Sequence, residues 1–401
     1  MFLRILGGFL LLIVTLALIA AGWFYRPWSD YSPARVAEAF NPANIFSVSL
    51  GMSDYFPYAD VETSNPQPLP RELAPLSVSY EYNGETRTLE QYLEESNALG
   101  LVVIHNGVVV HERYSNGADE TSRPTSWSVA KSFVATLIAM ALHEGRIDNL
   151  DQLAQEFAPQ YEGSAFGETS LRHLLMMSTG IDFVEDYSDP DSDVGVLFAD
   201  PFIWGSDIDH SLLQFERTLE AGTELAYISS ATHVLSAVLR GVYDQPLHEI
   251  VEEHIWQPLG MESDAYWNQN VPGEDGMALG YCCLNARTVD FARLGLLYLA
   301  DGEWNGERLL PEGWVDMATH ANAPFQEPGL VYSLRGYGLH FWFPETDRDE
   351  FFAAGIYGQY VWVDPSRNLV IARNAADPEW GPRTGESFAV FRAIAAEVAG
   401  E

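Results

Sequence analysis

The hydrophobic pattern divides the chain into one long apolar run and a body with both helical and strand-like periods. Residues 5–25 form an apolar run without a charge, long enough to cross a ~30 Å hydrocarbon layer as a helix. Trp23, Tyr25 and Trp28 gather at its far end, as aromatic residues do at a membrane interface. A cleaved signal peptide usually has a shorter apolar run and a clean cleavage site. We therefore favour an uncleaved anchor, with secretion after signal cleavage as the alternative.

Strand-like runs lie toward the two ends of the body and helical periods dominate its middle. Apolar β-branched runs on both sides of His105-Asn106-Gly107 predict a β-hairpin. Apolar spacing from Ser128 to about His143 predicts a helix that Gly145 ends. The same criteria predict helices at Leu171–Met177, Thr232–Val242, Pro246–Trp256, Thr288–Leu299, Pro311–Ala318 and Ser387–Val398, and strands at Gly338–Trp342, Gln359–Val363 and Leu369–Arg373.

This order of elements predicts the domain organisation and the fold class. A sheet begins, a helical block interrupts it, and the sheet is completed near the C-terminus. The expected class is α/β (α+β), an antiparallel sheet flanked by helices with an inserted, mainly helical domain. The expected divisions are an anchor or signal segment at 1–26, an extension at 27–90 and a main domain at 91–401, with its sheet at about 91–145 and 325–401 and its helical part at about 146–324.

The charge balance restricts the partners of the body. The 401 residues include 57 acidic and 21 basic side chains, for a net charge of −36. Such a surface repels nucleic acid phosphates and anionic lipid headgroups, so neither is expected to bind the folded part. The acidic surface serves solubility or adaptation to salt, and the sequence leaves both explanations open.

Lys131 is the only lysine of the chain, since 20 of the 21 basic residues are arginines. It lies three positions after Ser128, so both side chains fall on one face of the predicted helix. A partly buried amine can lose its proton near neutral pH, whereas a guanidinium stays charged. A serine activated by such an amine is a nucleophile for acyl transfer. The plain alternative is a helix N-cap followed by a solvated lysine.

Other kinds of chemistry find no support in the sequence. Cys282 and Cys283 are adjacent, and because neighbouring cysteines rarely meet disulfide geometry, we expect free structural thiols. No metal-ligand spacing, glycine-rich phosphate loop or Gly-x-Ser-x-Gly elbow occurs. We therefore expect no cofactor and no metal.

Further sequence blocks follow the Ser-x-x-Lys pair in a defined order. They are Leu171 to Gly180, Gly222 to Ser230 with Tyr227-Ile228-Ser229 inside it, Pro258 to Met261, Ala286 to Gly295, and Ala353-Ala354-Gly355 with the residues up to Gln359. Together these blocks resemble the class C β-lactamase-related serine hydrolases, a penicillin-binding-protein-like family. The likeness spans about residues 95–375 and is greatest to 6-aminohexanoate-dimer hydrolases and family VIII-type carboxylesterases.

The resemblance implies a β-lactamase/DD-peptidase-like fold and a role for each matched residue. Ser128 would be the nucleophile, Lys131 the base and Tyr227 the acid for the leaving group. The backbone N–H groups of Ser128 and Ile356 would form an oxyanion hole. The residues expected around them, in supporting or substrate-binding positions, are Ser229, Gly355 and Tyr357.

The third block departs from the family pattern, because no Lys or His stands at Ala353-Ala354-Gly355. That absence favours a neutral ester or amide as the small-molecule substrate and makes efficient penicillin turnover unexpected. The resemblance thus implies a serine hydrolase. The apolar N-terminal run independently predicts that it is held to the membrane by this helix, and the catalytic domain is expected outside the cytoplasm, on the periplasmic side. The alternatives are a D-Ala-D-Ala carboxypeptidase or β-lactamase, and a catalytically silent binding protein on the same fold.

Overall fold

A seven-stranded antiparallel sheet forms the centre of this computed structural model, which describes residues 2–29, 31–345 and 348–401. The strand order is β10-β11-β12-β13-β14-β4-β5, so the predicted hairpin pairs with strands from the far end of the chain. The strands are β4 (Ala98–His105), β5 (Val108–Tyr114), β10 (Arg335–Tyr337), β11 (Trp342–Pro344), β12 (Phe351–Gly355), β13 (Gln359–Asp364) and β14 (Leu369–Ala375).

Alternating side chains of β13 allow helices to pack on both faces of this sheet. Val361 and Val363 face Gly295 of helix α11 (Thr288–Leu299). On the opposite face, Trp362 packs against Phe391 of helix α13 (Thr384–Ala399). Both faces are therefore buried, which explains why β13 and β14 are continuously apolar or small along most of their length.

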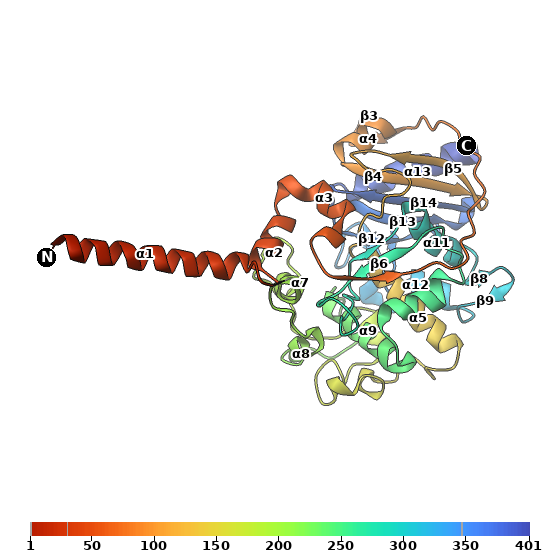
Figure 1. The fold of residues 1–401 in the computed structure, drawn as a ribbon. Helices are drawn as coiled ribbons and strands as arrows, with labels where there is room; N and C mark the ends of the chain where they lie inside the picture. Colours follow the sequence, from red (N-terminus) through yellow and green to blue (C-terminus); the bar gives the residue numbers. More distant parts are fainter. Residues whose placement is uncertain (1, 30, 346–347) are drawn as a thin grey trace.

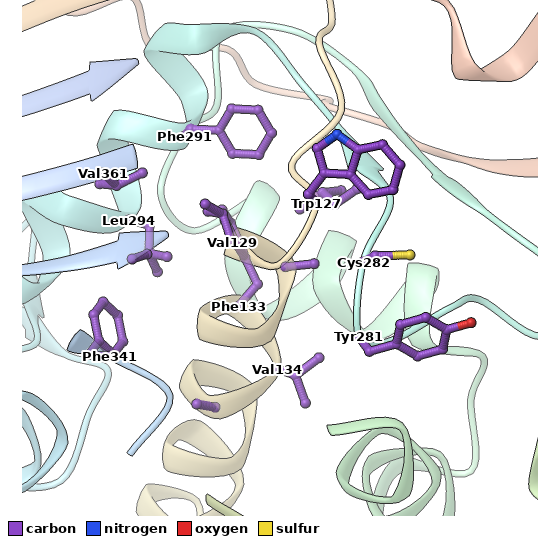
Figure 2. Packing of buried hydrophobic residues seen from close by; sticks show 14 of the residues in the cluster. Trp127, Val129, Phe133, Val134, Tyr281, Cys282, Phe291, Leu294, Phe341 and Val361 are labelled. Atoms are coloured by element: carbon purple, nitrogen blue, oxygen red, sulfur yellow. The ribbon is translucent and has the colours of Figure 1, made fainter. Parts of the chain in front are cut away.

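Helix α5 (Val129–His143) lies at the centre of the packing, between the sheet and the helical part. Figure 2 shows its Val129 and Phe133 directed toward Phe291 and Leu294 of α11, with Val361 of the sheet nearby. The helical part contains α6 (Leu171–Leu175), α7 (Asp193–Trp204), α8 (Ile208–Leu212), α9 (Ser229–Tyr243), α10 (Leu247–Val251), a π-helix at Glu252–Trp256 and α12 (Trp314–Thr319).

Helix α1 (Phe2–Tyr25) projects away from the body in Figure 1. Among the described residues, α1 is the one helix long and apolar enough to cross a membrane. The chain then continues along the body. Its elements there are α2 (Pro33–Ala39), α3 (Ile45–Leu50), β1 (Tyr58–Val61), the hairpin β2 (Ser79–Tyr82) and β3 (Glu85–Thr88), and α4 (Leu89–Glu95).

Small sheets and short helical turns complete the fold. Strand β1 pairs with β6, which pairs with β7, and β8 pairs with β9. The remaining strands are β6 (Ala265–Asn268), β7 (Leu284–Asn285), β8 (Glu303–Trp304) and β9 (Glu307–Arg308), and single 3-10 turns occur at Pro42–Asn44, Met52–Asp54, Ala154–Glu156, Pro159–Tyr161, Pro324–Gln326, Ile356–Gly358 and Pro365–Arg367.

Most of the predicted elements are present, but one predicted strand is wrong and several elements were not predicted, the longest of them in the body being α7. The strand predicted at Gly338–Trp342 is wrong, because these residues form mainly the turn between β10 and β11. His340 in that turn has a φ of 60°, a left-handed conformation that an extended strand excludes. Helix α7 was not predicted. Its interior Pro201 and its Gly195 interrupt the local signal for a helix.

The contact between α11 and the sheet gives a stability prediction at Gly295. A Cβ there would lie 2.7 Å from a methyl of Val370 and 2.9 Å from a methyl of Val361. Although alanine gains about 1 kcal/mol over glycine in helix propensity, overpacking costs about 1–3 kcal/mol. We expect Gly295→Ala to show a net loss of up to about 2 kcal/mol of unfolding free energy in denaturant melts.

Gly385→Ala in α13 is the matched control. A Cβ at Gly385 would approach only the flexible ends of Tyr82 and Leu334, at 3.3 Å and 3.4 Å. We expect this variant to be neutral or slightly stabilised. Equal behaviour of the two glycine variants would contradict the close packing of α11 on the sheet.

Candidate active site

Ser128 and Lys131 meet at the first turn of α5, as the i, i+3 spacing predicts. Ser128 is the N-cap residue, and Nζ of Lys131 lies 3.0 Å from its Oγ. The Ser128 side chain makes no capping bond to the helix backbone, so its hydroxyl is directed to the lysine instead. Lys131 is 2% exposed, which excludes the alternative of a solvated first-turn lysine.

Burial changes the proton affinity of Lys131. Desolvation lowers its pKa from 10.5 to about 8, and the negative charge of Glu185 opposes that shift in part. Nζ also donates a hydrogen bond to the carbonyl oxygen of Tyr281, at 2.9 Å. When the amine is neutral, one N–H is held by this carbonyl and the lone pair is left for the Ser128 proton.

Tyr227 completes the group, because its phenol lies close enough to the Ser128 hydroxyl for that hydroxyl to lower the Tyr227 pKa in part. Its ring stacks on Trp342 with centroids 5.4 Å apart, and Nζ of Lys131 lies 5.1 Å from the Tyr227 centroid. Burial and the charge of Glu185 raise the pKa of Tyr227 well above its ordinary value. Near neutral pH the phenol is therefore protonated, and Lys131 is the group that can be neutral.

Glu185 is a site residue that sequence reasoning missed. It accepts hydrogen bonds from the backbone N–H of Ser229 at 2.8 Å and from the Ser229 hydroxyl at 2.5 Å. The Tyr187 hydroxyl also donates to it, at 2.6 Å. Ser229 thus acts by holding this carboxylate at the start of α9. No periodicity marked Glu185, since it lies in an irregular segment between α6 and α7.

The end of β12 lies directly against the Ser128 backbone. A Cβ on Gly355 would lie 2.7 Å from the Ser126 carbonyl oxygen and 3.0 Å from the Ser128 nitrogen, so only glycine fits. Ile356 follows at once, which brings its backbone close to that of Ser128. The ring centroids of Trp127 and Tyr357 lie 5.5 Å apart. Both residues have left-handed φ values, 42° for Trp127 and 59° for Tyr357. Sparsely populated conformations of this kind concentrate at functional sites.

The two cysteines are joined in a disulfide, so the expectation of free thiols is wrong. Their adjacency alone suggested unsuitable geometry, but Cys283 takes a left-handed φ of 71°, which an ordinary strand or helix does not provide. The bonded pair directly follows Tyr281, whose carbonyl accepts the Lys131 hydrogen bond. The disulfide thus belongs to the segment that positions the lysine.

Two cavities meet at Ser128. One of about 230 Å³ is lined by Glu185, Tyr227, Tyr332 and Arg335 among others. The other, of about 360 Å³, contains Lys131 and Tyr357 on its wall and is mainly apolar. The described ranges contain no group of three or more His, Cys, Asp or Glu side chains placed to hold a metal ion.

Arg335 is the second residue that sequence reasoning missed. Its guanidinium lies 4.0 Å above the ring of Trp342 and 5.1 Å from that of Tyr332. It supplies a positive charge on the side of the site where the third sequence block lacks Lys or His. Arg335 reaches the cavity from β10, at the far edge of the sheet. Its distance in sequence from Ser128 and Lys131 therefore gave no indication that it belongs to the site.

Comparison with known proteins identifies the family. The family described as Beta-lactamase matches residues 86–393. A 6-aminohexanoate-dimer hydrolase from Paenarthrobacter ureafaciens is 30% identical over 322 residues, covering 76% of this chain and 81% of that protein.

Solved structures show the same fold. A structure from Bacillus anthracis, provisionally named a 6-aminohexanoate-dimer hydrolase, has a TM-score of 0.78 at 25% identity, covering 88% of this chain and 94% of that one. EstCE1, a hydrolase with promiscuous acyltransferase activity, has a TM-score of 0.57 at 17% identity, covering 77% and 96%. The predicted fold class and the predicted resemblance are both confirmed. With most of its length matched in this way, the chain belongs to the Beta-lactamase family and is a serine hydrolase.

Proposed function

We propose that the enzyme transfers an acyl group from an ester or amide to water through an acyl-enzyme on Ser128. The observation that carries this proposal is the buried amine of Lys131, 3.0 Å from the Ser128 hydroxyl and with its pKa lowered to about 8. A neutral amine at that distance can accept the hydroxyl proton as the oxygen attacks. An ordinary solvated lysine would be protonated and unable to do so.

In the first step, the Ser128 oxygen bonds to the acyl carbon while its proton passes to Nζ of Lys131. The carbonyl oxygen becomes an oxyanion, and the N–H groups of Ser128 and Ile356 stabilise it. Removing one such donor typically costs about 3–4 kcal/mol of transition-state stabilisation. The close approach of Gly355 to the Ser128 nitrogen supports this assignment, because it sets the two N–H groups near each other.

In the second step, the bond to the leaving group breaks and Tyr227 supplies its proton. Tyr227 suits this role because its phenol lies beside the Ser128 hydroxyl and its raised pKa keeps it protonated near neutral pH. The proton on Lys131 then replaces the one that Tyr227 gave away. Water attacks the acyl-enzyme with the amine again acting as base, which releases the acid and restores the Ser128 hydroxyl.

Labelling with a fluorophosphonate tests the nucleophile. We expect the intact mass of the wild type to rise by one phosphonyl group, and Ser128→Ala to stay unmodified. Ser122→Ala, in the loop before α5 with its hydroxyl bonded to Asp119, is the matched control and should label like the wild type. An unmodified wild type would contradict the assignment of Ser128. Rapid stoichiometric labelling by a fluorescent penicillin would instead favour the carboxypeptidase or β-lactamase alternative.

The pH dependence of ester hydrolysis tests the base. Below pH 8 Lys131 is mainly protonated, so kcat/KM should rise with pH and level off above a midpoint of about 8. Because the charge of Glu185 raises the pKa of Lys131, Glu185→Gln should move this midpoint to lower pH. The exposed Asp182→Asn is the control and should leave the midpoint in place. A midpoint shift to higher pH in Glu185→Gln would contradict the account.

We further propose that α1 is an uncleaved anchor with the catalytic body on the periplasmic side. Contacts between the C-terminal end of α1 and the body support the proposal that α1 stays attached to the mature protein. Arg26 donates a hydrogen bond to the Ile203 carbonyl at 2.7 Å, and the rings of Trp23 and Trp204 lie 6.0 Å apart.

The protein recovered from membranes should therefore have an intact mass that includes residues 1–25. Protease added outside spheroplasts should digest the body, and alkaline washing should not release it from the membrane. A soluble form that begins after Ala21 would favour the alternative of secretion after signal cleavage.

A further inference from the structure

The larger cavity beside Ser128 lies between two helices that the reaction chemistry does not use. Its volume of about 360 Å³ falls within the usual range for small-molecule pockets, about 300–1,000 Å³. Its apolar wall comes from the α2 segment, with Val36, Ala37 and Phe40, and from α7, with Val194, Phe198 and Ala199. A wall of this kind binds hydrocarbon by removing apolar surface from water.

The position of Tyr227 decides which part of a substrate this cavity holds. Tyr227 lines the smaller cavity and not the larger one. The leaving group must lie beside the acid that protonates it, and therefore in the smaller cavity with Arg335. The acyl group extends from Ser128 in the other direction, into the cavity between α2 and α7. This step rests on the proposed acyl-enzyme function.

The two helices of the wall also lie next to the C-terminal end of α1, around Trp23 and Arg26, which we call the root of α1. Helix α2 follows α1 after a short connection, and α7 contacts α2. At the end of α7, the ring of Trp204 lies 4.2 Å below the guanidinium of Arg26. Figure 1 shows α2 and α7 together where α1 leaves the body. If α1 spans a bilayer, the cavity wall lies next to the membrane surface.

Exposed apolar side chains continue from this root toward the cavity. Trp28, Trp204 and Phe40 are 74%, 54% and 47% exposed, and Phe40 lines the cavity itself. A third cavity, of about 150 Å³, shares Phe40, Trp127, Phe198 and Tyr357 with the larger one and extends the apolar region beneath α3. In a chain with a net charge of −36, such a patch needs a purpose other than solubility.

The charges at the cavity disfavour anionic ligands, and its apolar wall favours an uncharged chain. Asp186 and Asp189 lie on its wall, and Lys131 is the one basic residue among those that line it. A free fatty acid or an anionic lipid headgroup would be repelled by the two carboxylates.

We propose that the cavity between α2 and α7 binds the long acyl chain of a neutral, membrane-dissolved ester or amide. The chain enters from the bilayer between these helices, with its carbonyl group reaching Ser128.

Acyl-chain length tests the cavity in the full-length enzyme, reconstituted in phosphatidylcholine vesicles. Full burial of one methylene group gives about a fourfold gain in binding. With partial burial, kcat/KM for p-nitrophenyl octanoate should exceed that for the acetate by roughly tenfold or more. Ala37→Trp fills the cavity from an exposed position and should remove that preference, because it lowers kcat/KM for the octanoate more than for the acetate.

A second variant and a control keep the test independent of folding. Ala199→Phe fills the cavity from α7 and should have the same effect as Ala37→Trp. Ala43→Trp, exposed and outside both cavity walls, should keep the wild-type preference. Acetate hydrolysis without a preference for longer chains, or equal losses for both esters in the two cavity variants, would overturn the acyl site. No hydrolysis and no phosphonylation would overturn the proposed function itself, and the acyl site with it.

Placement of the substrate tests access from the membrane. A fluorogenic neutral oleate ester is supplied either in the vesicles that carry the enzyme or in separate vesicles. We expect at least about fivefold faster hydrolysis when enzyme and ester share a bilayer, since transfer through water is slow for an oleoyl chain. Equal initial rates would overturn access from the bilayer.

Discussion

The site depends on the removal of one amine from water. Lys131 is 2% exposed, and its desolvation brings the pKa down to about 8, where the neutral form is abundant enough to act as a base. An uncompensated buried ammonium would destabilise the fold. The groups around Lys131 reduce the cost of burying the charged amine, but they do not cancel the lowering of its pKa. The Tyr281 carbonyl accepts one N–H, the Tyr227 ring lies 5.1 Å away, and Glu185 adds a nearby negative charge.

The fold brings this environment together from distant parts of the chain. Helix α5 supplies the serine and the lysine, the segment before α9 supplies Tyr227, and the end of β12 closes against the Ser128 backbone. The central sheet joins strands from both ends of the chain, so β12 reaches α5 only after the helical part has been inserted. Positive φ values at Trp127, Cys283 and Tyr357 occur where these segments meet.

The sequence predicted the parts of the site that depend on local patterns. The hairpin at Asn106-Gly107 and the Ser128–Lys131 spacing are local, and Tyr227 came from an ordered set of blocks that resembles a family. Glu185 and Arg335 were missed because tertiary packing alone brings them to the site. The disulfide was missed because its feasibility depends on the backbone at Cys283, which residue spacing does not report. Helix α7 was missed for a different reason: Gly195 and Pro201 inside it interrupt the helical signal, although the helix forms a cavity wall.

Because Lys131 is the single lysine of the chain, the protonation of its amine can be measured directly. Lysine labelled with 13C at Cε would give one side-chain resonance, from Lys131 alone. Its chemical shift followed by NMR across a pH titration reports the protonation of that amine without any assay of activity. If Lys131 is the base, the midpoint should be about 8 in the folded enzyme, against 10.5 for an ordinary lysine. A midpoint at or above 10.5 would contradict that role, because Lys131 would then be a charged structural group and not the base.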